Sequence, residues 1–237
     1  MLKPESDHSL RFAPIWCAIA LGAAALTTMA PSRPLAAVMA AGASPAVHRL
    51  IERLQRHYQE TASFTAKFDE TITRPGAPPL KRSGALTWLL PGRIRFDYAA
   101  PQPETIVSDG RTLYDYDPGL NQVIETPLKN AIKAQAAAAL LLGAGNLERD
   151  FVASSPSTPS RDGLEYAILT PKAGGPRVTI GADPATSNIV SLTIADALGN
   201  RTGFHFFAIR LNVAIAASVF AFKVPDGADV VTSGAGS

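Results

Sequence analysis

The feature that most constrains this chain is a series of segments in which apolar and polar residues alternate one by one. From residue 63, apolar side chains recur two residues apart at Phe64, Ala66 and Phe68, and the same parity returns at Ile72. This period of two places them on one face of a β-strand. The pattern returns at 86–90 and 94–98 around Pro91-Gly92, and at 104–108 and 111–116 around Asp109-Gly110. Because such short turn sequences join neighbouring antiparallel strands, the sequence predicts an antiparallel meander.

Two helical patterns frame and interrupt these strands. Ser44 and Pro45 are typical of the N-cap and first residue of a helix, which is predicted to run through Glu60. An Ala- and Leu-rich run predicts a second helix over 128–143. Further strands are predicted at 122–126, near 151, and at 164–170, 177–180, 189–195, 202–210 and 219–224. About eleven or twelve strands and two or three helices, without an internal repeat or a domain-sized linker, indicate one α+β domain over 44–232. Residues 233–237 are expected to form a disordered tail.

The N-terminal segment is typical of an export signal. Lys3 and Arg11 precede an apolar run at 15–26 that has signal-peptide length and is short for a membrane-spanning helix. Small residues follow, so we expect a signal peptide over 1–41, cut between about 37 and 43, and a periplasmic mature protein. Acidic Glu5 and Asp7 are unusual in such a segment, which leaves an uncleaved anchor open.

Charge and composition exclude several functions. The 22 Lys and Arg nearly balance the 20 Asp and Glu without forming runs, so no basic stripe is available for nucleic acid. A single Cys excludes a disulfide framework and a thiolate zinc cage. His48 and His57 lie too far apart on the first helix to share a metal ion. With no nucleophile or phosphate-loop motif either, we expect no enzyme activity, cofactor or metal.

The apolar residues of the strands allow two interpretations. A long meander with few helices can fill a core with these side chains, or it can curve and leave a space beneath its helices for a hydrophobic ligand. Periodicity alone does not separate the two.

Several stretches, in order, resemble the outer-membrane lipoprotein carrier family of the LolA type. They are Ser63–Phe68 after the helix, Gly84–Leu86, Leu90–Tyr98, Pro103–Pro118, Leu140–Gly143, Leu169–Lys172 and Phe220–Val230. The resemblance covers essentially residues 44–231. It implies an open, unclosed antiparallel β half-barrel of about eleven strands, with two or three helices as a lid over a hydrophobic cavity.

The resemblance also implies a function. Carriers of this family bind the acyl chains of lipoproteins released by an inner-membrane ABC-type complex and deliver them to an outer-membrane acceptor. They have neither a catalytic site nor a cofactor, and we expect this chain to be a monomer. A lipid-sensing regulatory domain and a carrier of a non-protein lipid share the fold and stay open as alternatives. A periplasmic lipid hydrolase is the least favoured alternative, because no nucleophile motif is present.

The resemblance places candidate lipid-binding residues on the first helix, the matching strands and the second helix. They are Leu50, Leu54, Tyr58, Trp88, Leu90, Phe96, Tyr98, Tyr114, Tyr116, Leu140, Leu141 and Leu142. These faces follow from strand parity, so a slip of one residue would invert them. Family members carry an Arg that latches the lid just before the hairpin Pro, whereas this chain has Leu90. Arg93 and Arg95, with Ile94 between them, form either a docking surface for an acidic partner or a solvated strand face.

Overall fold

The computed structural model describes residues 44–134, 146–158 and 161–233. All of them belong to one compact unit, residues 39–237. The predicted signal peptide and nearly all of the predicted tail lie outside the described residues. The helices are α1 (Pro45–Gln59), α2 (Leu128–Ala134), α4 (Leu147–Asp150) and the 3-10 helix η1 (Ala217–Phe220). The strands are β1 (Ser63–Thr73), β2 (Leu80–Leu89), β3 (Arg93–Tyr98), β4 (Glu104–Asp109), β5 (Thr112–Asp117), β6 (Gln122–Pro127), β7 (Phe151–Ser154), β8 (Glu165–Pro171), β9 (Arg177–Ala182), β10 (Ile189–Ala195), β11 (Arg201–Leu211) and β12 (Asp229–Thr232).

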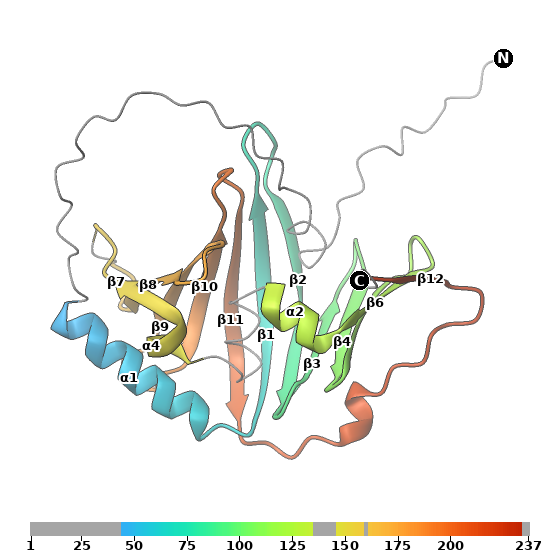
Figure 1. Cartoon of the computed structure of the whole chain (residues 1–237), viewed down its shortest axis with the longest axis horizontal. Helices are drawn as coiled ribbons and strands as arrows, with labels where there is room; N and C mark the ends of the chain where they lie inside the picture. The colour runs from blue at the N-terminus through green and yellow to red at the C-terminus, as the bar shows by residue number, and fades with distance from the viewer. Residues whose placement is uncertain (1–43, 135–145, 159–160, 234–237) are drawn as a thin grey trace. The chain divides into compact units, whose positions relative to one another are not determined.

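The strands form a single sheet, as predicted (Figure 1). Its order is β12-β6-β5-β4-β3-β2-β1-β11-β10-β9-β8-β7. Every pairing is antiparallel except that of β12 with β6, which is parallel. Within the described residues the two end strands, β12 and β7, do not pair with each other, so the sheet is unclosed.

The sheet register defines two faces. One row of paired residues runs from Ala167 through Ile180, Leu192 and Phe204 to Glu70 and Arg82. We call the face that bears this row the inner face and the opposite one the outer face. Most of the buried apolar residues of β1 to β3 and β8 to β11 lie on the inner face.

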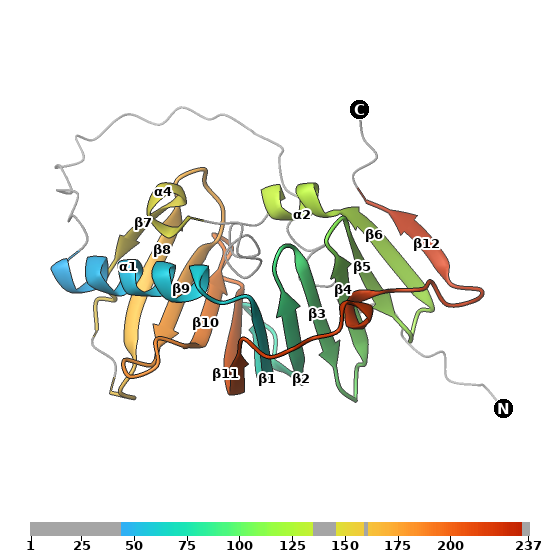
Figure 2. The same cartoon turned by 90° about the horizontal axis from the view of Figure 1, so that it is seen from below.

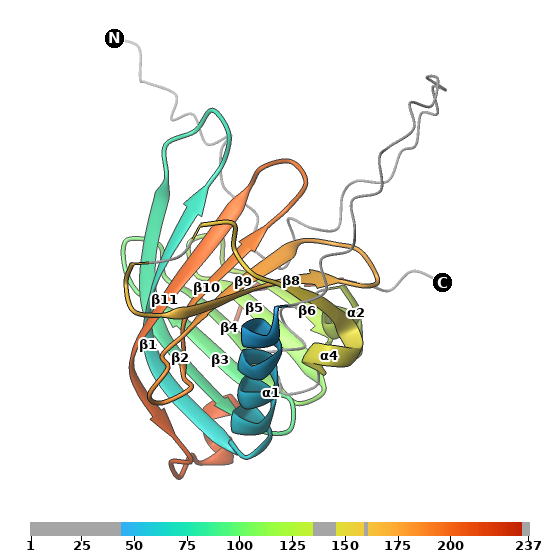
Figure 3. The ribbon, with the colours of Figure 1, turned by 90° about the vertical axis from the view of Figure 1, so that its left-hand side faces the viewer.

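Helix α1 covers part of the inner face. The Ser44 hydroxyl accepts a hydrogen bond from the backbone N–H of Val47 at 3.4 Å, and Pro45 follows at the first helical position, as predicted. The helix buries Val47, Leu50, Ile51 and Leu54, which recur at helical spacing. It packs against β7 and β8, and Figures 2 and 3 show it lying across the strands.

Two predicted elements differ in the structure. The second helix begins at Leu128, as predicted, but only its part up to Ala134 lies within the described residues. The predicted strand at 219–224 is wrong: η1 ends at Phe220, an unpaired extended segment follows, and the last strand is β12. The alternating apolar residues of this segment pack on the outer face of the sheet: Phe220 is fully buried, and the Phe222 ring contacts Tyr114. In the described part of the chain, the backbone of the segment does not pair with a neighbouring strand.

Candidate functional site

Seven aromatic side chains cover the middle of the inner face. They come from β1, β2, β3 and β11 and are Phe64, Phe68, Trp88, Phe96, Tyr98, Phe204 and Phe206. The ring of Phe68 lies at their centre, 5.6 Å from Phe96, 5.1 Å from Tyr98 and 5.8 Å from Phe204, in edge-to-face geometry. All seven are buried. The sequence thus folds into a continuous aromatic surface with the chemistry to bind a hydrocarbon.

A glycine on β2 makes room for the central ring. An added Cβ at Gly84 would lie 2.8 Å from the Phe68 Cζ atom and 2.3 Å from the Asp97 carbonyl oxygen. Both distances are below van der Waals contact. Glycine at this position therefore avoids the close contacts that a Cβ atom would make with the Phe68 ring and the backbone of β3.

Polar contacts fix the position of α1 over the strands. The Arg53 Nε atom donates to the Ser187 hydroxyl at 3.1 Å, and His57 Nε2 lies 3.0 Å from the Asn188 side-chain oxygen. The Tyr58 hydroxyl accepts from the Ile189 N–H at 2.9 Å, and burial raises the pKa of this phenol to about 12. These bonds attach one flank of α1 to the connection between β9 and β10.

Charged side chains occupy one end of the inner face. Glu70, Arg82, Glu104 and Asp115 lie on β1, β2, β4 and β5, and all are largely buried. Arg82 pairs with Glu104, lies 3.8 Å from Glu70, and places its guanidinium 3.6 Å from the Tyr98 ring centroid. Burial, opposed by Arg82 and reinforced by Glu104, raises the pKa of Glu70 to about 7. Burial and the neighbouring Glu104 also raise the pKa of Asp115 well above its usual range.

With this geometry established, comparison with known proteins identifies the family. Residues 59–223 match the family model described as outer membrane lipoprotein carrier protein LolA. The chain belongs to this family. An outer-membrane lipoprotein carrier protein of Cupriavidus pinatubonensis is 34% identical over 200 residues, 82% of this chain and 93% of the relative. A protein of the same description from Cupriavidus necator is 39% identical over 150 residues, 63% of this chain and 70% of the relative. An uncharacterized conserved protein of Thermus thermophilus shares the fold, with a TM-score of 0.51, 9% identity, and coverage of 78% of this chain and 98% of that one.

Five of the twelve residues that the LolA resemblance assigned to lipid binding are buried on α1 or on the inner face. Leu50 and Leu54 are buried on α1, and Trp88, Phe96 and Tyr98 are buried on the inner face. Leu140, Leu141 and Leu142 lie outside the described residues. The role of these side chains in lipid binding stays a prediction.

The inner-face assignment of Tyr114 and Tyr116 is wrong. Phe96 pairs with Ile106, which pairs with Asp115, so Asp115 is the residue of β5 on the inner face. Both tyrosines face outward, where their rings lie 5.1 and 6.1 Å from the ring of Phe222. Parity failed because Phe222 contacts both tyrosines on the outer face, whereas the buried side chains of β5, Leu113 and Asp115, lie on the inner face. Phe222 belongs to the 217–222 segment, which we call the C-terminal strap.

The three docking candidates divide between the two faces. Ile94 is 1% exposed on the inner face, which removes it from any docking surface in this conformation. Arg95 donates to the Asp97 carboxylate at 2.7 and 2.8 Å and to the Val219 carbonyl at 3.2 Å. Arg95 therefore holds the C-terminal strap, whereas the described part of the chain shows no such side-chain contact for Arg93, which stays a docking candidate.

Leu90, at the family's latch position, follows the last residue of β2. Its backbone N–H donates to the Ala62 carbonyl at 2.9 Å, and its side chain is half-buried. The polar contacts of Arg53, His57 and Tyr58 hold α1 to the sheet in this chain. Residues 140–142, the second-helix part of the predicted lid, lie outside the described residues.

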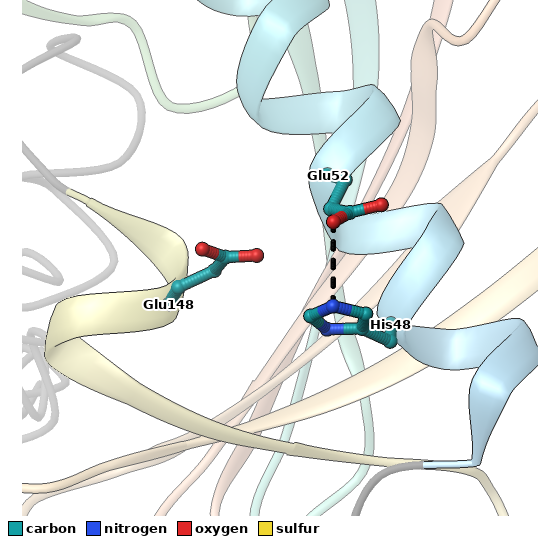
Figure 4. Close-up of side chains that lie close together, drawn as sticks. All are labelled: His48, Glu52 and Glu148. Carbon is teal, nitrogen blue, oxygen red and sulfur yellow. Dashed lines mark ion pairs between the residues drawn. The ribbon is translucent and has the colours of Figure 1, made fainter.

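Three exposed side chains that the sequence did not bring together meet between α1 and α4. Figure 4 shows His48, Glu52 and Glu148, whose nearest ligand atoms all lie within 4.8 Å of one another. His48 Nε2 is 3.3 Å from Glu52, one helical turn away. The sequence places His48 and Glu52 four residues apart on one helix, whereas Glu148 comes near them only because α4 lies beside α1 in the fold. All three are exposed, so we assign no metal to them.

Within the part of the chain that the structure describes, none of the helices has both the length and the apolar composition to cross a membrane.

Proposed function

We propose that this protein is a periplasmic carrier that binds the acyl chains of lipoproteins on the inner face of its sheet. The observation that carries the proposal is the continuous surface of seven buried aromatic residues on β1, β2, β3 and β11. Membership of the lipoprotein carrier family supports it, as do the names of the relatives. The predicted export signal at 1–41 supports the periplasmic location.

The physical need for such a surface is large. A lipoprotein with three acyl chains of about fifteen methylenes each, at ~0.8 kcal/mol per methylene, would cost on the order of 35 kcal/mol to expose to water. A carrier between two membranes must supply an equivalent apolar surface. The inner face does so with rings, which present large rigid areas at little cost in side-chain entropy.

The same surface must open to receive cargo. In the structure its aromatic residues are buried in contact with one another and with other parts of the chain. Acyl chains therefore reach it only when this packing opens. We propose that the protein receives cargo from an inner-membrane ABC-type release complex, gives it to an outer-membrane acceptor and catalyses no reaction.

A fluorescent acyl probe tests the binding surface. Phe96→Glu places a carboxylate among Phe68, Tyr98 and Phe204, where desolvation of the charge opposes binding of a hydrocarbon. We expect saturable binding to the wild type and at least tenfold weaker binding to this variant. Phe207→Glu is the matched control, because Phe207 is 39% exposed on the outer face of β11. Equal probe affinity of a folded Phe96→Glu variant would show that the rings form an ordinary core.

Analysis of bound material separates the alternatives that share the fold. Mass spectrometry of material that co-purifies with the protein should find lipid-modified peptides. Free lipids alone would instead indicate a carrier of a non-protein lipid or a lipid sensor.

A further inference from the structure

The charged end of the inner face contains more carboxylates than cations. Glu70, Glu104 and Asp115 come together around one guanidinium, that of Arg82. The Glu70 side chain is fully buried, and Arg82 and Glu104 are 9% and 11% exposed. If all three acids were ionised, this cluster would carry a net charge of −2 out of contact with water.

Several carboxylate oxygens of the cluster have no hydrogen-bond partner. They are both oxygens of Glu70, Oε1 of Glu104 and Oδ2 of Asp115. The Tyr98 hydroxyl lies near Glu70 and slightly lowers the pKa of Glu70, but it does not form a hydrogen bond of normal geometry with either Glu70 oxygen. Arg82 forms a direct ion pair with Glu104, whereas its Nε atom lies 3.8 Å from Oε2 of Glu70. A buried charge without a partner is so costly that the group takes up a proton instead.

We propose that these carboxyl groups form a proton-binding site, in which Glu70 and Asp115 each hold a proton and protonated Asp115 donates a hydrogen bond to Glu104. The Glu104 and Asp115 carboxyl groups lie close enough for a hydrogen bond once Asp115 is protonated. Protonation turns one Asp115 oxygen into a donor, so that the contact with Glu104 no longer joins two negative charges. Protonated Glu70 leaves the single positive charge of Arg82 to balance the single negative charge of the pair.

The other groups that face the site bring it no further positive charge. Asp117, further along β5, adds negative charge near Asp115, and Tyr98 on β3 contributes a ring beneath Arg82. On β6, the residue paired with Asp115 is Ile124, which brings no charge. Burial is the main cause of the raised pKa values of Glu70 and Asp115, and these raised values also favour protonated carboxyl groups.

Proton binding makes folding depend on pH with a definite sign. Glu70 has a folded pKa of about 7, above its usual value of 4.5, so the folded state binds the proton more tightly than the unfolded state. Its contribution to stability is complete below the unfolded value and is lost as pH rises through 7. For each such proton, the folding equilibrium constant falls by up to about tenfold per pH unit in this window.

The site also borders the aromatic surface, because Glu70 and Phe68 lie two residues apart on the same face of β1. Loss of the proton places charge beside the rings. We therefore expect acyl-probe affinity to fall as pH rises, a consequence that rests on the proposed function. The proton site itself does not.

The test measures stability and protonation of the whole protein between pH 5 and 8.5. Urea unfolding of the wild type should show that the folding equilibrium constant falls as pH rises. The slope of its logarithm against pH gives the number of protons that folding takes up, and Glu70→Gln and Asp115→Asn should each lower that number by about one. The amide that Asp115→Asn introduces can donate to Glu104 in place of protonated Asp115, which favours folding of that variant. Asp69→Asn is the matched control, because Asp69 is exposed on the outer face beside Glu70, and its slope should equal that of the wild type.

Infrared spectroscopy reads the protons directly. The wild type at pH 6 should show the C=O band of a protonated carboxylic acid, reduced in Glu70→Gln and in Asp115→Asn but not in Asp69→Asn. A wild type without that band, or with a pH slope that both substitutions leave unchanged, would overturn the proposal. So would loss of the slope on treatment with EDTA, which would show a metal ion in place of the protons. None of these readouts depends on lipid binding, so failure of the carrier function would leave them intact.

Discussion

The contact between Gly84 and Phe68 allows a sharp test of how the inner face is built. In Gly84→Ala, the new Cβ would lie 2.3 Å from the Asp97 carbonyl oxygen, 2.8 Å from Phe68 Cζ and 3.1 Å from the Asp97 carbonyl carbon. The ring can turn away, but the carbonyl belongs to β3, whose ladder with β2 fixes it. Something in the sheet must therefore shift.

The expected cost follows from two opposing effects. Alanine in a strand restricts the unfolded chain more than glycine does, which by itself stabilises the protein by roughly 0.5–1 kcal/mol. Overpacking that moves backbone typically costs about 1–3 kcal/mol. The clash is with backbone, so we expect the second effect to win and the free energy of unfolding to fall by about 1–2 kcal/mol.

Gly203 on β11 supplies the matched control for this substitution. An added Cβ there would meet its nearest atom, Thr193 Oγ1, at 3.7 Å, an ordinary contact. Gly203→Ala should therefore leave stability unchanged or raise it by up to about 1 kcal/mol. Urea unfolding of both variants and the wild type gives the comparison. A Gly84→Ala variant as stable as Gly203→Ala would show that Phe68 and the Asp97 carbonyl do not approach Gly84 as described.

Two further substitutions test how the C-terminal strap is held on the outer face of the sheet and how α1 is held on the inner face. Phe220→Ala should lower the free energy of unfolding by about 3–5 kcal/mol, because Phe220 belongs to the C-terminal strap and is fully buried. A loss below ~1 kcal/mol in urea unfolding would contradict packing of the strap on the sheet. Tyr58→Phe should cost about 1–3 kcal/mol, because it leaves the Ile189 N–H without its acceptor. Amide exchange at Ile189 should accelerate in that variant, and unchanged exchange would show that this bond does not hold α1.

The strands and turns could be predicted because each carries its own local signal. The Pro91-Gly92 and Asp109-Gly110 turns fix hairpins by backbone conformation, and Gly92 and Gly110 have positive φ angles of 71° and 99°. The alternation from Phe64 to Ile72 likewise fixes the inner face of β1. These features depend on a few neighbouring residues.

Features that depend on distant segments could not be predicted in the same way. Strand parity alone places Tyr114 and Tyr116 on the wrong face, because Phe222, which contacts them on the outer face, lies about 100 positions later in the chain. The charged cluster left a trace in the sequence, since Glu70 shares its parity with Phe68 and Arg82 shares its parity with Leu86. Only the register of five strands shows that Glu70, Arg82, Glu104 and Asp115 meet.

Photocrosslinking from the two faces of the sheet tests the central claim most directly. A photoreactive phenylalanine analogue replaces Phe96 on the inner face or Phe207, which is exposed on the outer face, and the protein is illuminated in its own cells. Mass spectrometry then identifies what is attached. The account predicts acyl chains of lipid-modified peptides on residue 96 and none on residue 207. Equal labelling of the two positions, or attachment at residue 96 only to other parts of this chain, would contradict a lipoprotein-binding inner face.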